Sequence, residues 1–306
     1  IEGLMATNTD LSADNYLEVA WNAGNYEGTQ YTVPLDIHGN AMYYNTDLLD
    51  KYDANTFLDD DVVTIEEILS LDGKLDEGQY AINNALIEWV TLANVVNAGG
   101  DISDEAGNPT INTDAMRSVV EQLKSVADAG LMSPYGEDGY AMFQSGDVLF
   151  STDGTWTSTA HGSVEGLNFG VTNIYSVTPD KFTNRSSAHL FSLLNNEDRT
   201  DEKEQGVADF LSWMRENSLD WAGAGQIVAS KEVFESEEYQ QYPQSFFTSS
   251  DVEKEASYIF DYKYYSYVES ALGTVLSDMI YGNITIDEGL DQAQKTVEDL
   301  IAENAS

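Results

Sequence analysis

The stretch that decides the fold is residues 31–45, YTVPLDIHGNAMYYN. Two short apolar and aromatic runs, 31–35 and 41–44, flank a group of polar and small residues. This group contains Asp36, His38, Gly39 and Asn40. Such an order of residues fits a hairpin turn, a catalytic Asp/His pair or another arrangement, and the surrounding chain has to decide between them.

The chain is strongly acidic along its whole length. Its 306 residues contain 54 Asp and Glu against 13 Lys and Arg, a formal net charge of -41, while 42% of the residues are hydrophobic. That hydrophobic content is enough for one large or two ordinary folded domains. This composition argues against binding to nucleic acid or to an anionic membrane surface, because both need clustered Lys and Arg. The acidity favours solubility in an exposed or saline setting.

The chain has no cysteine, so disulfides, thiolate metal sites and cysteine nucleophiles are excluded. No apolar run approaches the roughly 18 residues of a membrane-spanning helix, and the start IEGLMATNTD lacks the features of a signal peptide. We therefore expect a soluble chain from which any targeting segment has been removed or was never present.

Helices are the clearest predicted elements. Capping-box pairs, Thr64 with Glu67 and Thr285 with Glu288, predict helices over 64–70 and 285–302. Apolar residues at helical spacing predict three more, over 112–130, 200–217 and 264–280.

Short apolar strands alternate with these helices, which predicts an α/β fold with mostly parallel sheets. The strands are expected within 31–35, 41–44, 147–151, 169–177 and 188–194. No Pro- or Ser-rich linker divides the chain into consecutive halves. Two domains would therefore have to be joined by several crossings of the chain.

No catalytic or cofactor motif stands out. The chain lacks the serine hydrolase elbow, the P-loop, the dinucleotide fingerprint and H-E-x-x-H. The three histidines, His38, His161 and His189, are too dispersed for a local metal signature. The acidic segment 101–112 misses the EF-hand spacing and is interpreted as a solvated loop. With 54 acids, some carboxylate pair for glycoside hydrolysis is always available, so that signal carries little weight. We expect neither a metal nor a cofactor.

Aromatic residues are more informative, since 5 Trp, 18 Tyr and 11 Phe exceed the needs of two modest cores. Several stand beside small or polar residues, including Trp89, Trp156 and the run 258–269. Such rings suit sugars, which stack their C–H faces on aromatic rings and direct hydroxyls toward polar groups. For each single ring, a place in the core is an equally good interpretation.

Four segments in order resemble the extracellular solute-binding proteins of bacterial ABC importers, in the carbohydrate-binding group that includes maltose-binding protein (family 1). They are YEGTQYTVPLDIHGNAMYYNTDLL, NVVNAGGDISDEAGNPTINTDAM, YAMFQSGDVLFSTDGTW and the closing helical pair. Each motif is loose, but their joint order covers nearly the whole chain. The family's opening strand, helix and strand have no counterpart here, so the resemblance places residue 1 inside a longer mature protein.

The resemblance implies a two-lobed α/β fold of the periplasmic-binding-protein kind, with a ligand cleft between lobes, several hinge crossings and closure by hinge motion. It assigns residues 1–36 and 175–240 to the first lobe, incomplete at its N-terminus. It assigns 37–174 and 241–306 to the second. The group at 36–40 is then the first crossing between lobes.

The resemblance also implies the ligand contacts. These are Asp36, His38, Asn40, Trp89, Trp156, His189, Tyr264 and Tyr265. For His38 and His189, a hydrogen-bonded structural histidine is the alternative. Trp21 and Trp213 are assigned to packing, and Trp221 is left undecided.

The function implied is capture of an oligosaccharide, without catalysis, for membrane permease subunits of an ABC importer. The protein is expected to be a monomer, either periplasmic or a cell-surface lipoprotein. Two alternatives stay open: a binding protein for another polar ligand, such as a peptide, polyamine or metal, and an acidic glycoside hydrolase with a carboxylate pair.

Overall fold

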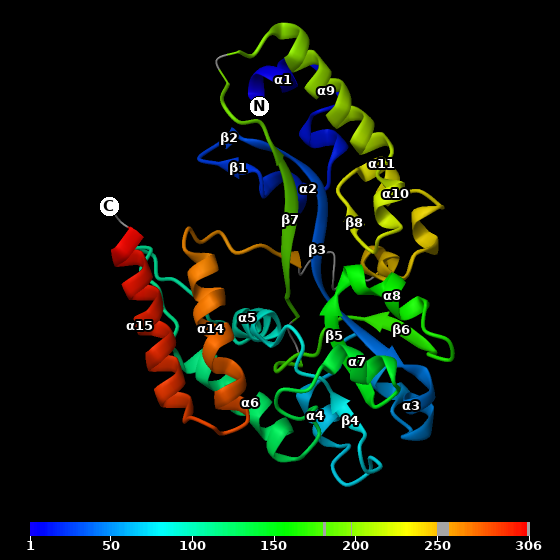
Figure 1. The fold of residues 1–306 in the computed structure, drawn as a ribbon. Helices are drawn as coiled ribbons and strands as arrows, with labels where there is room; N and C mark the ends of the chain where they lie inside the picture. Colours follow the sequence, from blue (N-terminus) through cyan, green and yellow to red (C-terminus); the bar gives the residue numbers. More distant parts are fainter. Residues whose placement is uncertain (180–181, 197, 250–256, 305–306) are drawn as a thin grey trace. The chain divides into compact units, whose positions relative to one another are not determined.

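A computed structural model describes residues 1–179, 182–196, 198–249 and 257–304. The chain divides into two compact units (Figure 1). Unit 1 comprises Ile1–Gly39, Thr155–Ser163 and Ser186–Asp251. Unit 2 comprises Asn40–Gly154, Val164–Arg185 and Val252–Ser306.

This division differs from the expected lobes in four segments, 37–39, 155–163, 175–185 and 241–251. The first difference has a simple reason in strand pairing. The strand at the first crossing pairs with one partner strand up to Gly39 and with another from Asn40 onward. The assignment of ligand-closing lobes stays a prediction.

Unit 1 is built on the first half of a long strand, β3, flanked by short helices. Its elements are α1 (Glu2–Thr7), α2 (Glu18–Asn22), β1 (Asn25–Tyr26), β2 (Thr29–Gln30), β3 (Thr32–Asn45, as far as Gly39), α8 (Ser158–Gly162), β7 (Asn184–Ser192, from Ser186), α9 (Asp201–Glu216), α10 (Leu219–Ala222), β8 (Ile227–Val228), α11 (Lys231–Phe234) and α12 (Phe246–Ser249). Short 3₁₀ helices cover Ala13–Asn15, Thr155–Thr157, Tyr239–Gln241 and Pro243–Ser245. In this unit β3 pairs antiparallel with both β7 and β8.

Unit 2 continues β3 and adds the longest helices. Its elements are the rest of β3, α3 (Thr46–Lys51), α4 (Ile65–Leu69), β4 (Tyr80–Ile82), α5 (Ile87–Asn97), α6 (Asp114–Asp128), α7 (Gly139–Gln144), β5 (Val148–Gly154), β6 (Phe169–Thr172), the start of β7, β9 (Ser257–Tyr258), α14 (Tyr265–Ile280) and α15 (Ile286–Asn304), with a 3₁₀ helix at Asn55–Leu58. Apolar side chains of β3, α5, α6, α14 and α15 form one continuous core.

The expectation of mostly parallel sheets was wrong. The strand β3 pairs antiparallel with β5, β6, β7 and β8. Among the named strands of the described residues, the parallel pairs are β4–β5 and β7–β9. Alternating strands and helices give parallel sheets when each helix connects two neighbouring strands. The partners of β3 instead come from distant parts of the chain and run in the opposite direction.

The hairpin interpretation of residues 31–45 is also excluded, because Thr32–Asn45 form one continuous strand. The five predicted helices are confirmed as α4, α6, α9, α14 and α15. Both capping boxes form, with Thr64 and Thr285 each exchanging hydrogen bonds with the glutamate three residues on.

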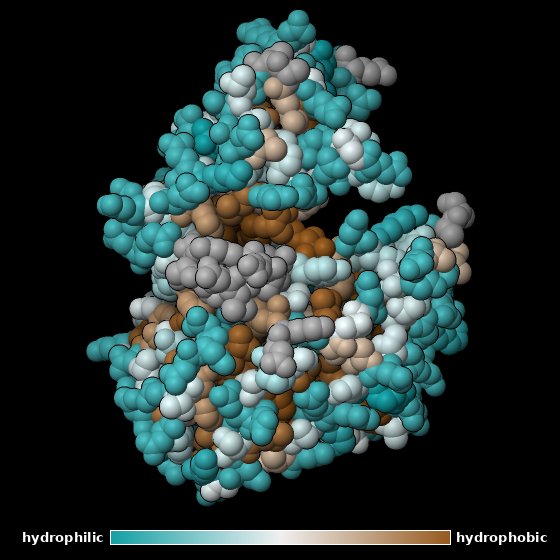
Figure 2. Space-filling model, turned by 180° about the vertical axis from the view of Figure 1, so that it is seen from behind, coloured by the Kyte–Doolittle hydropathy of each residue, from teal (hydrophilic) through white to brown (hydrophobic). Residues whose placement is uncertain are grey.

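Hydrophilic residues cover most of the outer surface on the face shown in Figure 2. Among the described residues, no helix has both the length and the apolar character needed to cross a membrane.

Candidate ligand-binding site

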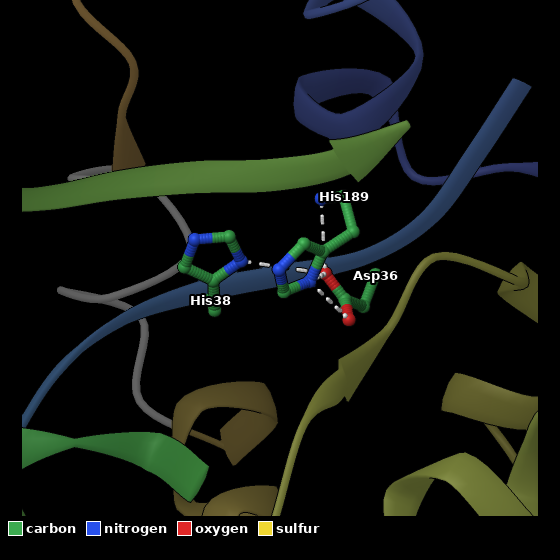
Figure 3. A group of neighbouring side chains, drawn as sticks. All are labelled: Asp36, His38 and His189. Atoms are coloured by element: carbon green, nitrogen blue, oxygen red, sulfur yellow. Dashed lines mark hydrogen bonds and ion pairs between the residues drawn. The ribbon is translucent and has the colours of Figure 1, made fainter. Parts of the chain in front are cut away.

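A polar cluster in unit 1 is formed where β3 lies beside β7. Side chains two residues apart on a strand lie on the same face, so Asp36 and His38 share one face of β3. His189 on β7 is paired directly with Asp36 in the strand register. The two strands therefore bring His189 together with Asp36 and His38, although His189 lies 153 positions from Asp36 in the sequence (Figure 3).

A β-bulge sets this pairing. The register shifts between Pro34 and Asp36, so that Leu35 is the extra residue on β3. Pro34 lacks the amide hydrogen that a regular ladder requires, and such bulges re-aim the side chains that follow them. The bulge places Asp36 opposite His189. In a regular ladder, Leu35 would stand opposite His189 instead.

The carboxylate of Asp36 is fully buried and lies at the centre of the cluster. The indole nitrogen of Trp221 donates to its Oδ2 at 2.5 Å. The backbone N–H of His189 donates to its Oδ1 at 3.1 Å, and His189 Nδ1 lies 3.0 Å from both oxygens. His38 Nδ1 lies 3.4 Å from Oδ1. Because an ionised carboxylate only accepts hydrogen bonds, the ring nitrogens facing it act as donors in this arrangement.

These contacts keep Asp36 ionised. Burial alone would raise the pKa of the carboxyl, but the hydrogen bonds from His38, Trp221 and His189 outweigh it and hold the pKa below its ordinary value. The Asp36 carboxylate is therefore negatively charged at neutral pH.

Aromatic rings adjoin the polar cluster. The imidazole rings of His38 and His189 lie with centroids 4.3 Å apart, and the indole of Trp156 meets His38 edge-on at 6.0 Å. Gly225 packs closely against the backbone of Thr155 and Trp156. Its φ is +89°, and a Cβ at this position would stand 2.6 Å from the carbonyl oxygen of Thr155. Only a glycine allows the backbone to come this close beside Trp156.

The cluster is reached through its histidines. The side chain of His189 is 54% exposed and that of His38 is 13% exposed, while that of Asp36 has no exposed surface. The imidazoles are therefore the solvent-facing part of the cluster, and the Asp36 carboxylate lies behind them.

The predicted residues of unit 2 fall into other environments. Trp89 and Tyr265 are brought together by Arg185, whose guanidinium lies 3.8 Å from the Trp89 ring centroid and whose Nε donates to the Tyr265 hydroxyl at 2.8 Å. Glu269 accepts from the Trp89 indole and pairs with Arg185 at 3.8 Å. Burial raises the pKa of Tyr265 to about 12. One face of Trp89 is thus covered by a cation.

Tyr264 and Asn40 are placed differently. Tyr264 stacks on Tyr267, with ring centroids 5.7 Å apart, at the start of α14. Asn40 is fully buried, and its side-chain oxygen and nitrogen have no hydrogen-bond partner among the described residues.

Sequence reasoning missed the anchoring role of Trp221 and the positions of Arg185 and Glu269. No local motif marks them, because each acts through a partner more than 80 residues away or on another strand or helix. The assignment of Trp213 to packing was wrong: this residue is 56% exposed on α9, whereas Trp21 is buried as expected.

A comparison with protein families shows the family to which the chain belongs. The family model described as bacterial extracellular solute-binding protein matches residues 2–248, most of the chain. The chain is a member of this family. No curated protein sequence shows significant similarity to it.

Solved structures of solute-binding proteins share the fold. A cyclic alpha-maltosyl-1,6-maltose binding protein from Arthrobacter globiformis superposes with a TM-score of 0.78 at 18% identity, over 98% of this chain and 80% of that one. A maltose/maltodextrin-binding domain from Bdellovibrio bacteriovorus, bound to maltotriose, gives 0.74 at 17% identity, over 97% and 82%. A protein from Mycobacterium tuberculosis in complex with glycerophosphocholine gives 0.79 at 14% identity, over 100% and 79%.

These findings confirm the predicted family and the α/β fold of the two-lobed periplasmic-binding-protein kind. The family is one of binding proteins and is extracellular by description.

Proposed function

We propose that this solute-binding protein captures an oligosaccharide for import by an ABC transporter. The observation that carries the proposal is the cluster of unit 1, where an aromatic ring, Trp156, adjoins hydrogen-bonding groups ordered by a buried carboxylate. Sugars need this combination, because their C–H faces pack on rings while their hydroxyls require polar partners. The sugar-binding proteins among the structural neighbours support the same ligand class.

In this proposal the residues have distinct roles. Trp156 provides the stacking surface, and the imidazoles of His38 and His189 hydrogen-bond the hydroxyls. Asp36 orients both imidazoles from beneath, because its own oxygens already accept from Trp221 and His189. A ligand lacking a matching hydroxyl would leave these polar groups unpaired, which is a strong basis for selectivity.

The remaining predicted contacts, Asn40, Trp89, Tyr264 and Tyr265, belong to the proposal as further ligand contacts. So do the permease partner, the monomeric state, the absence of turnover, and a periplasmic or lipoprotein location. Trp89 can offer the sugar only the ring face that Arg185 does not cover.

Replacement of the stacking ring tests the proposal. We expect Trp156→Ala to weaken oligosaccharide binding ten-fold or more, from a loss of about 1.5 kcal/mol of stacking and burial. The measurement is titration calorimetry with a panel of neutral oligosaccharides. The matched control is Trp213→Ala, which removes an exposed tryptophan of the same unit and should bind like the wild type.

Two outcomes would count against the proposal. If no oligosaccharide of the panel gives a heat of binding and polyamines or peptides do, the site belongs to another ligand class. Release of reducing ends during incubation with oligosaccharides would identify a glycoside hydrolase instead.

A further inference from the structure

The same three side chains in unit 1 have the composition of a transition-metal site. Asp36, His38 and His189 each offer one ligand atom, and these atoms lie within 4.8 Å of one another. Two imidazole nitrogens and one carboxylate oxygen form a donor set that suits Zn²⁺, Co²⁺, Ni²⁺ or Cu²⁺. Calcium and magnesium prefer oxygen donors alone.

The distances from the Asp36 carboxylate oxygen to the two imidazole nitrogens match tetrahedral coordination. Bonds of 2.0–2.1 Å to a tetrahedral ion separate neighbouring ligand atoms by about 3.3 Å. In the structure, Nδ1 of His189 lies 3.0 Å and Nδ1 of His38 lies 3.4 Å from Oδ1 of Asp36. The Nδ1 atoms of His38 and His189 both face the carboxylate (Figure 3), so small side-chain shifts suffice to admit an ion.

The groups behind the carboxylate are arranged as outer partners of a metal ligand. When an ion takes the place of the two ring N–H donors, Trp221 Nε1 and the backbone N–H of His189 still hold Asp36. Metal-bound carboxylates characteristically receive such hydrogen bonds. The exposed side chain of His189 gives an ion access from solvent, and a net charge of -41 raises the local concentration of cations.

We propose that Asp36, His38 and His189 bind one divalent transition-metal ion, with solvent at the remaining position. The ion is held by the two Nδ1 atoms and a carboxylate oxygen of Asp36. The site requires only residues of unit 1 and does not depend on an oligosaccharide ligand.

The test is a titration of chelator-treated protein with Co²⁺ in the presence of excess Mg²⁺, which occupies the non-specific acidic surface. We expect one Co²⁺ per chain, with the visible absorption of tetrahedral cobalt. Binding should weaken at least ten-fold in His38→Gln and in His189→Gln. It should be unchanged in Asp220→Asn, which removes an exposed negative charge next to Trp221 but no ligand. Equal Co²⁺ binding by all four proteins, or none by the wild type, would overturn the proposal.

A measurement on the wild type alone guards against misfolded variants. The chain has only three histidines, so imidazole nitrogen NMR resolves each of them. Zn²⁺ should shift the Nδ1 signals of His38 and His189 and leave buried His161 unchanged. Unshifted signals for both cluster histidines would contradict the proposal.

Parallel oligosaccharide titrations separate this proposal from the transport function. If metal-free protein binds sugars and does not bind Co²⁺, the transport function is retained and the metal site is rejected. If the protein binds Co²⁺ specifically and does not bind sugars, the metal site is retained and the oligosaccharide function is rejected.

Discussion

Asp36 organises the polar cluster although its own side chain has no exposed surface. Its buried carboxylate accepts hydrogen bonds from an indole, a backbone amide and the imidazoles. A buried charge is stable only when such partners surround it. The donors are therefore as necessary to the site as the histidines that we propose as ligand contacts.

Trp221→Phe isolates one of these donors, because it keeps most of the ring and removes the indole N–H. We expect the free energy of unfolding at pH 7 to fall by roughly 1.5–3 kcal/mol, the usual contribution of a hydrogen bond to a charged group. Urea denaturation measures it. Trp213→Phe, at an exposed position, should change stability little. Equal stability of the two variants would show that Trp221 does not anchor Asp36.

Asp153, at the end of β5, behaves in the opposite way from Asp36. Burial, assisted by the charge of Asp138 and opposed by a backbone hydrogen bond, raises its pKa to about 6. Between this value and the ordinary value of 3.8, the folded protein binds a proton that the unfolded chain does not. Asp153 therefore lowers stability at neutral pH, and this penalty disappears as the pH falls from about 6 to 4.

Asp153→Asn should consequently be more stable than the wild type at pH 7.5, by roughly 1–3 kcal/mol. The difference should shrink toward zero at pH 4, measured by urea denaturation at a series of pH values. Asp72→Asn, at an exposed site, serves as the control. A stability difference that does not vary with pH would refute this reading of Asp153.

The sequence allowed the candidate site to be predicted only in part. His38, Asp36 and Trp156 could be selected because each lies in a stretch with recognisable neighbours. Trp221 could not, since its role depends on a hydrogen bond to a residue 185 positions away. The covering of Trp89 by Arg185 was equally hidden, because it depends on packing between separate elements.

At the scale of elements, helices were predictable and strand directions were not. Helix ends are encoded locally, as the capping boxes of α4 and α15 show. Strand pairing depends on partners far along the chain, so no local sequence pattern indicates that the neighbours of β3 are antiparallel. The continuity of β3 was hidden for a related reason: Pro34 and Gly39 are typical strand breakers, yet a bulge accommodates the first.

The packing of α14 against α15 depends on a glycine. A Cβ at Gly289 would stand 2.3 Å from the sulfur of Met279 on α14. Gly289→Ala should therefore destabilise the protein by roughly 1–3 kcal/mol through overpacking, although alanine is the better helix former. Thermal or urea unfolding measures the change.

Gly206 on α9 is the matched control for this substitution, because a Cβ there meets no atom within 4 Å. Gly206→Ala should raise stability by up to about 1 kcal/mol. If both alanine variants were stabilised, the close approach of α14 and α15 would not limit the packing.

At the scale of the whole molecule, the charge is the dominant property. A formal net charge of -41 produces self-repulsion that favours expansion of the chain. Salt shortens the range of this repulsion, from a Debye length of about 30 Å at 0.01 M to about 3 Å at 1 M. Stability should therefore increase with ionic strength.

We expect the midpoint of thermal unfolding to rise steadily between about 0.01 M and about 1 M NaCl. Potassium chloride should act alike, because screening depends on ionic strength and not on the identity of the cation. A midpoint that stays constant or falls with added salt would contradict the view that repulsion limits stability.

The division of the chain has a consequence for inheritance. Each unit is assembled from three separate segments, and β3 contributes to both. Neither unit corresponds to one uninterrupted stretch of gene. A single recombination event cannot transfer either unit intact to another protein, so ligand preference in this lineage is expected to change by point substitution within the strands and not by exchange of whole modules.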